Sequence, residues 1–169
     1  VASISDYAFA GCSSLASITI PNGVTSIGEA SFFECSALTS ITIPESVNSI
    51  GGAFFRCTSL TSITIPEGVT FIDSAAFFVC TALKTVYIPR SLTTYGTKSI
   101  PFLDSTTITD IYYAGTQAEW EQYKLSGMFE DSVLESATIH YTTLATFNAM
   151  PAKTVYSKGE ALDLTGLSV

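Results

Sequence analysis

The chain has 169 residues and a formal net charge of −8. An acidic chain repels phosphate backbones and anionic lipid, so the charge excludes nucleic acid as a partner and disfavours an anionic membrane surface. Hydrophobic residues make up 47% of the sequence, but the longest apolar run covers only the six residues from Ala75 to Cys80, so no segment can span a membrane.

Four residue types recur with a period of 23 residues, shortened once to 22. A single unit of this length cannot bury its own isoleucines, phenylalanines and leucines, whereas stacked units share one continuous core. The recurring positions are Cys12, Cys35, Cys57 and Cys80; Pro21, Pro44, Pro66 and Pro89; Phe9, Phe32, Phe54 and Phe77; and Leu15, Leu38, Leu60 and Leu83.

Each unit carries the pattern Leu-x-x-Ile-x-Ile-Pro, as in Leu60, Ile63, Ile65 and Pro66. The alternation has the period of two that a half-buried strand requires, and proline then ends the hydrogen-bonded ladder. An Ile-Gly-x-x-Ala-Phe segment follows and should return across a convex side in one helical or 3-10 turn. We therefore expect an α/β solenoid with about six parallel strands in one β-sheet, four regular units and two irregular ones.

The pattern decays after Thr94, and no Phe-x-x-Cys follows. Either Phe102 or Leu103 should occupy the phenylalanine position of the fifth unit. Ile108, Ile111 and Tyr113 restore the strand motif.

Residues 116–124 should form a short helix, and residues 137–141 a last strand. Thr116 is a suitable N-cap with Glu119 at the capping-box position. Trp120, Tyr123 and Leu125 share one helix face, so this helix should cover the end of the core.

The signature Ala-Phe-x-x-Cys-x-x-Leu-x-x-Ile-x-Ile-Pro resembles the BspA-type leucine-rich-repeat family, which occurs mainly in surface proteins of gut and oral bacteria and of some protists. It covers residues 1–95 strongly, and residues 110–141 resemble the family's terminal unit. The resemblance implies a leucine-rich-repeat right-handed superhelix over residues 1–141 with a C-terminal capping unit. It also implies an extracellular or cell-surface location and further repeats in the parent chain, because Val1 to Ile4 matches Val24 to Ile27.

Two segments follow the repeats. Residues 142–150 have the composition of a linker. The sequence from Lys153 resembles the opening strands of a bacterial Ig-like domain, so residues 151–169 are interpreted as its truncated start. This resemblance implies a multi-domain parent protein.

The cysteines form a ladder with neighbours about 5 Å apart, which is within disulfide range. Their Cβ vectors should be parallel, which is poor disulfide geometry, so buried free thiols are favoured over bridges such as Cys12 to Cys35 and Cys57 to Cys80. Zinc is disfavoured because CxxC and histidine clusters are absent. A Cys57→Ser change should destabilise the chain by roughly 1–3 kcal/mol, since the new hydroxyl has no assured partner.

The sequence gives little support for a catalytic function. His140 is the single histidine, and the motifs of nucleophilic, zinc-dependent or phosphate-binding sites are absent. Asp110 and His140 share a sheet face, but the diagonal separation of roughly 7 Å between such positions is too long for a base and its orienting group. We expect no enzyme activity, no cofactor and no metal.

The face of the sheet is more informative. Its two outward columns change from small hydroxyls in the early units to aromatic and charged groups in the later ones. Large rings on an exposed face are not required by the core and are common contact residues. The first column consists of Ser17, Ser40, Ser62, Thr85, Asp110 and Thr138, and the second consists of Thr19, Thr42, Thr64, Tyr87, Tyr112 and His140.

We therefore predict a ligand-binding site at Thr85, Tyr87, Asp110, Tyr112 and His140. Binding should depend on pH near 6 to 7 if His140 keeps the ordinary histidine pKa of about 6.5. In the alternative interpretation, these side chains hydrogen-bond one another and merely finish the sheet.

Phe33, Phe55 and Phe78 form a second aromatic column. They either pack on one another or offer a lateral contact to another protein.

The function expected from this architecture is a non-enzymatic binding or adhesion module with a protein partner, for example a host surface protein. Carbohydrate binding is the competing class, with Tyr87 and Tyr112 as stacking platforms. A structural spacer that carries other domains is the third.

Overall fold

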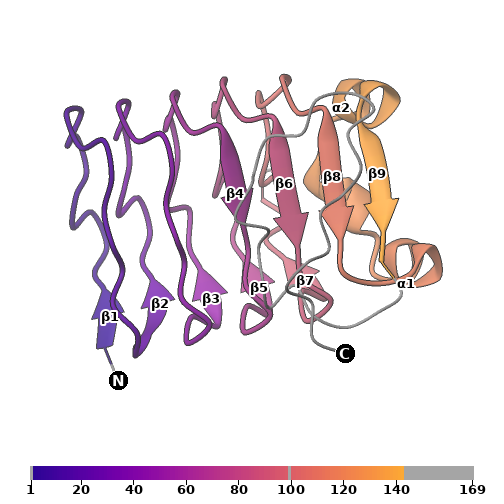
Figure 1. Cartoon of the computed structure of the whole chain (residues 1–169), viewed down its shortest axis with the longest axis horizontal. Coiled ribbons are helices and arrows are strands. Elements are labelled where there is room, and N and C mark those ends of the chain that lie inside the picture. The colour runs from indigo at the N-terminus through magenta and orange to yellow at the C-terminus, as the bar shows by residue number, and fades with distance from the viewer. Residues whose placement is uncertain (1, 99, 143–169) are drawn as a thin grey trace, which may run out of the picture.

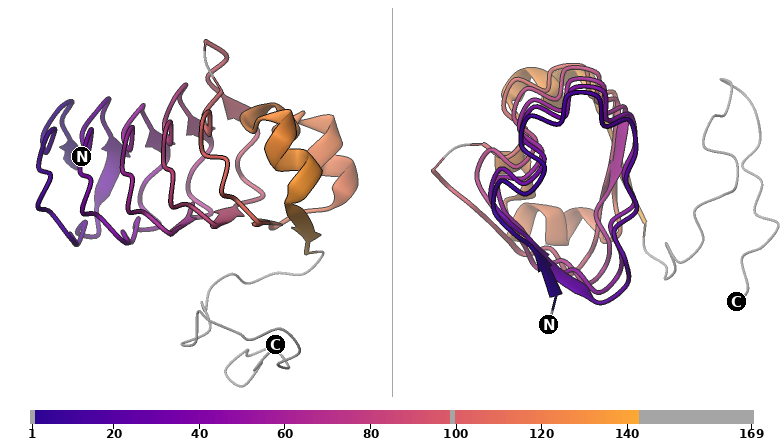
Figure 2. Two further views of the ribbon diagram at one scale, coloured as in Figure 1. Left: turned by 90° about the horizontal axis from the view of Figure 1, so that it is seen from above. Right: turned by 90° about the vertical axis from the view of Figure 1, so that its left-hand side faces the viewer.

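The computed structural model describes residues 2–98 and 100–142. Thr142 apart, the predicted linker and the predicted Ig-like start lie outside the described residues. Successive turns of the chain stack along one axis (Figure 1), and they superimpose when viewed along it (Figure 2). The predicted solenoid is confirmed.

The strands form two parallel sheets. A five-stranded sheet contains β1 (Ala2–Ile4), β2 (Val24–Ile27), β3 (Ser49–Ile50), β5 (Phe71–Ile72) and β7 (Thr94–Tyr95). A four-stranded sheet contains β4 (Ser62–Thr64), β6 (Thr85–Ile88), β8 (Asp110–Tyr113) and β9 (Thr138–Tyr141). In the first two units the same line continues as a single parallel bridge between Thr19 and Thr42.

The expectation of a single sheet was wrong. The Leu-x-x-Ile-x-Ile motif forms the four-stranded sheet as predicted, but the Val-x-x-Ile segment after each proline turn pairs as well. Its strands are two to four residues long, and the burial of Val24 and Ile27 with two half-buried residues between them has no period of two. The pairing continues through inter-unit bonds such as Gly51 N–H to the Ile27 carbonyl at 2.8 Å.

The Ala-Phe segments of the regular units form turns rather than the expected helical or 3-10 turn. Residues in the left-handed region interrupt them, for example Glu34 at φ 57° and Arg56 at φ 61°. A helix cannot pass such residues, so the amides donate to the next unit instead. Glu34 N–H, for instance, donates to the Phe55 carbonyl at 2.9 Å.

A ladder of stacked phenylalanines forms the centre of the core. Neighbouring ring centroids lie 4.7 to 5.3 Å apart with interplanar angles of 13° or less. Phe102, rather than Leu103, fills the fifth place and is fully buried. The members are Phe9, Phe32, Phe54, Phe77, Phe102 and Phe129.

The second phenylalanine column is half-buried and packs on itself. Phe33 and Phe55 lie 5.1 Å apart, and Phe55 and Phe78 lie 4.8 Å apart. The guanidinium of Arg56 lies 5.4 Å from the Phe55 ring. Packing between stacked rings is therefore confirmed for this column.

All four cysteines are free thiols, but the ladders are not buried throughout. Cys12 is exposed, and Phe9 and Leu15 are only half-buried, because the first unit of the structure has a neighbour on one side only. Each of the other three thiols lies 3.2 Å from the carbonyl of a phenylalanine in the preceding unit and donates to it. Burial raises the pKa of Cys35 and Cys57, and that of Cys80 to about 12.

Thiol exposure predicts the pattern of alkylation. Under native conditions a maleimide or iodoacetamide should label Cys12, while the three buried thiols react slowly because they are covered and stay protonated. In denaturant without reductant, mass spectrometry should find four labels per chain. Two labels in denaturant would reveal one disulfide and no label would reveal two, and equal native rates at all four sites would contradict the buried ladder.

Position 105 shows what a hydroxyl does in the cysteine ladder. Ser105 is fully buried, and its Oγ donates to the Phe77 carbonyl at 2.7 Å, as the thiols do. The hydroxyl of a Cys57→Ser variant therefore has an acceptor, contrary to the premise drawn from the sequence. We now expect a loss of about 1 kcal/mol in the free energy of unfolding, measured by chemical denaturation. A Ser105→Cys variant is the matched reverse change and should unfold near the parent; a loss of about 3 kcal/mol for Cys57→Ser would contradict the shared geometry.

Three short helical segments cover the C-terminal end of the core: α1 (Gln117–Gln122), η1 (Leu125–Met128) and α2 (Asp131–Ser136). The capping box of Thr116 and Glu119 is present as predicted. Trp120 is buried and packs on Tyr113 and Phe129. Among the described residues, none of the helices has the length and apolar character needed to cross a membrane.

Candidate functional site

The four-stranded sheet brings the predicted site residues onto one face. Its register places Thr64, Tyr87, Tyr112 and His140 opposite one another on successive strands. Val86 on β6 and Ile111 on β8 are buried and precede Tyr87 and Tyr112 directly. Because side chains alternate along a strand, the site side chains point away from the core. The columns deduced from the repeat are therefore the columns of the structure.

An aromatic stack runs across β6, β8 and β9. The rings of Tyr87 and Tyr112 lie 4.7 Å apart with an interplanar angle of 15°. The rings of Tyr112 and His140 lie 4.3 Å apart with an angle of 8°. Tyr112 is thus held between two rings, and all three side chains are half-buried.

Asp110 and His140 are in direct contact, which corrects the expectation from their diagonal spacing. His140 Nε2 lies 2.9 Å from Asp110 Oδ1, and each side chain is 37% exposed. The roughly 7 Å expected for a diagonal pair separates backbones, whereas two extended side chains that lean toward each other close that gap. Thr109 Oγ1 donates to the other carboxylate oxygen at 2.9 Å.

The two tyrosine hydroxyls stay protonated over the physiological range. Burial raises the pKa of Tyr87, and the neighbouring Tyr112 and Asp110 raise it further. Burial and then Asp110 raise the pKa of Tyr112. Both side chains therefore offer neutral hydroxyl groups to a partner.

Thr85 lies beside Asp110 in the second outward column, half-buried at the start of β6. A serine-protease-like triad also needs a hydroxyl nucleophile on the second imidazole nitrogen. Within the described part of the chain, the His140 ring has Asp110 as its sole hydrogen-bond partner. The described residues also contain no group of three or more histidines, cysteines or carboxylates that could hold a metal ion.

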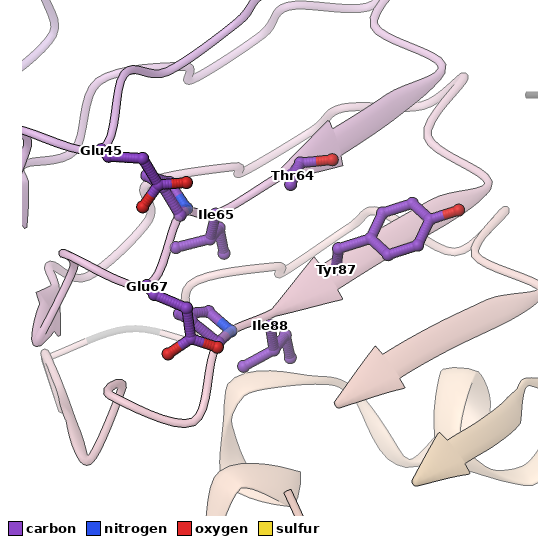
Figure 3. Close-up of a pocket in the computed structure, with 8 residues that line it drawn as sticks. Glu45, Thr64, Ile65, Glu67, Tyr87 and Ile88 are labelled. Atoms are coloured by element: carbon purple, nitrogen blue, oxygen red, sulfur yellow. The ribbon is translucent and has the colours of Figure 1, made fainter. Parts of the chain in front are cut away.

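A surface depression lies beside the stack, where β4 and β6 lead into the proline turns. We call it the acidic depression. Ile65, Pro66, Ile88 and Pro89 form its apolar floor. Figure 3 shows the carboxylates of Glu45 and Glu67 on one side of it and Thr64 and Tyr87 on the other.

Sequence reasoning missed this depression. The sequence signal for it was the dipeptide Pro-Glu, which occurs in two successive units at Glu45 and Glu67. The next unit has Pro89-Arg90 instead. Arg90 does not fill the place, because its guanidinium turns to α1 and bonds Glu119 through Nε at 2.8 Å.

The family model described as "BspA type Leucine rich repeat region (6 copies)" matches residues 2–132. None of the curated proteins matches the chain.

Three solved structures of bacterial proteins resemble the chain. A leucine-rich-repeat protein of T. pallidum is 30% identical over 66% of this chain, with a TM-score of 0.63. A leucine-rich cell surface protein of Faecalibacterium prausnitzii is 38% identical over 72%, with a TM-score of 0.67. A leucine-rich-repeat protein of Bacteroides ovatus shares the fold at 23% identity over 85%, with a TM-score of 0.56. The chain spans 52%, 32% and 46% of these proteins, respectively.

Proposed function

The chain belongs to the BspA-type leucine-rich-repeat family, and on that premise we propose that it is a non-enzymatic binding module of a bacterial cell-surface or secreted protein. It presents the outer face of its four-stranded sheet to a protein partner, with Thr85, Tyr87, Asp110, Tyr112 and His140 at the contact. The similar F. prausnitzii protein is a leucine-rich cell surface protein, which supports the location.

One observation carries the proposal: the Tyr87–Tyr112–His140 stack is ordered by its own contacts before any partner arrives. A preordered aromatic surface loses little conformational entropy on binding, and tyrosines contribute apolar area together with a hydrogen-bonding tip. The Asp110–His140 bond fixes the last ring of the row. Rigid aromatic anchors of this kind are frequent hot spots of protein interfaces.

The geometry favours a protein over a sugar. A carbohydrate stacks on an open ring face, but both faces of Tyr112 are covered by the neighbouring rings. What Tyr112 presents outward is its edge and its hydroxyl. A row of edges suits a protein surface better than a sugar ring.

Parallel screens of the purified chain test this proposal. We expect hits on an array of immobilised host surface proteins and none on a glycan array. Hits confined to glycans would replace the protein partner by a carbohydrate, and silence in both screens would favour the structural spacer.

A further inference from the structure

The acidic depression combines two carboxylates with an apolar floor. Glu45 and Glu67 are both exposed and occupy equivalent positions in successive units, Pro-Glu after each strand. Stacked units are separated by roughly 4.8 Å, the spacing between neighbouring strands, so the two like charges are close to each other. A single cation bound in the depression can therefore contact both carboxylates.

No cation of the described residues neutralises this pair. The ion pairs found there join Arg56 to Glu34, Arg90 to Glu119 and His140 to Asp110, and none includes Glu45 or Glu67. Backbone N–H groups of Arg90 and Ser91 donate to the two Glu67 oxygens at 3.2 and 3.4 Å. These bonds orient the Glu67 carboxylate without neutralising its charge.

The chemistry of an occupant follows from this lining. It needs a delocalised positive charge that can reach two neighbouring carboxylates and an aliphatic portion that can lie over Ile65 and Ile88. A guanidinium supplies five N–H donors in a planar fork and also packs well against aromatic rings such as Tyr87, whereas an ammonium is a more strongly hydrated point charge. Calcium and similar ions prefer six or more oxygen ligands, more than two carboxylates supply.

We propose that the acidic depression receives an arginine side chain of the protein partner. The guanidinium lies between Glu45 and Glu67, the methylene stem crosses the floor, and the Tyr87 ring forms the far wall. The inference rests on the proposed function, which it deepens: the partner places a basic residue at the N-terminal edge of the aromatic stack.

The test uses N-acetyl-L-arginine N-methylamide as the probe, with binding followed by two-dimensional NMR of the whole chain. The backbone signals of Thr64, Glu67 and Tyr87 should shift saturably. The isosteric citrulline derivative, which lacks the charge, should shift them far less. Equal shifts with citrulline, stronger binding of the matching lysine derivative, or competition by calcium would each overturn the assignment to arginine.

Glu45→Gln with Glu67→Gln should weaken binding of the arginine probe by about fivefold. Asp131→Asn with Glu135→Gln, two exposed changes on α2, removes the same two negative charges, so it is the control for the altered net charge and should leave binding unchanged. An unaltered affinity of the double variant would overturn the inference. A protein partner that needs Tyr112 but neither glutamate would overturn it while the proposed function stands. Arginine binding in the depression, together with silence in the protein screen, would remove the proposed function and, with it, a protein partner as the source of the arginine.

Discussion

Phe54→Ala should destabilise the chain by about 3–5 kcal/mol, the cost of truncating a fully buried phenylalanine. Phe54 lies in the middle of the aromatic ladder and stacks at 5.3 Å on both Phe32 and Phe77. Its removal deletes two ring contacts and opens a cavity that backbone hydrogen bonds between units prevent from closing. Chemical denaturation followed by circular dichroism measures the effect.

Phe55→Ala is the matched control, since it removes the same side chain one position along. Phe55 is half-buried on the surface column, so its loss should cost less than half as much. Equal losses for the two variants would contradict a core centred on the Phe54 ladder.

Trp120→Ala should be comparably damaging, at about 3–5 kcal/mol, for a different reason. Trp120 is 4% exposed and contacts Tyr113, Phe129 and Tyr141, with ring centroids 5.5, 6.2 and 6.3 Å away. Without it the cap no longer seals the last turns, and a solenoid with an uncovered end exposes apolar surface. Lower stability should therefore be accompanied by aggregation, measured by light scattering during thermal unfolding.

Tyr7→Ala provides the comparison for Trp120. Tyr7 is 62% exposed, so removing that ring should change the free energy of unfolding by no more than about 0.5 kcal/mol. A Trp120→Ala variant that unfolds like the Tyr7 variant would show that the cap contributes little.

The repeat period made the stacking and the site columns predictable. Residues 22 or 23 apart must meet on neighbouring turns, so the sequence alone assigns Tyr87 to the same column as Thr64. The capping box was predictable because Thr116 and Glu119 have a fixed local spacing.

Features that depend on side-chain direction or on short irregular backbone were not predictable in the same way. Two-residue strands such as β3 carry too few residues to show a period, so the five-stranded sheet was missed. Arg56 adopts a left-handed conformation, which a glycine at that position would have indicated in the sequence, but the residue there is an arginine.

The Asp110–His140 bond and the acidic depression were missed for a related reason. The bond depends on how far two side chains lean along the sheet. The depression arises from the way successive proline turns lie beside each other, which residue spacing alone does not specify. Distances between backbone positions constrain such contacts only loosely.

The most direct test of the proposed binding face compares two double variants against a protein partner identified in the array screen. Tyr87→Ala with Tyr112→Ala should reduce affinity about a hundredfold or more, as expected when two hot-spot residues are lost. Thr19→Ala with Thr42→Ala changes the same column in the first two units, where both threonines are exposed, and should leave affinity unchanged. The thermal midpoint of the tyrosine variant should fall by no more than a few degrees, because the rings lie outside the core. Unchanged affinity of the tyrosine variant, or loss of binding together with collapse of the fold, would contradict a binding site on this sheet face.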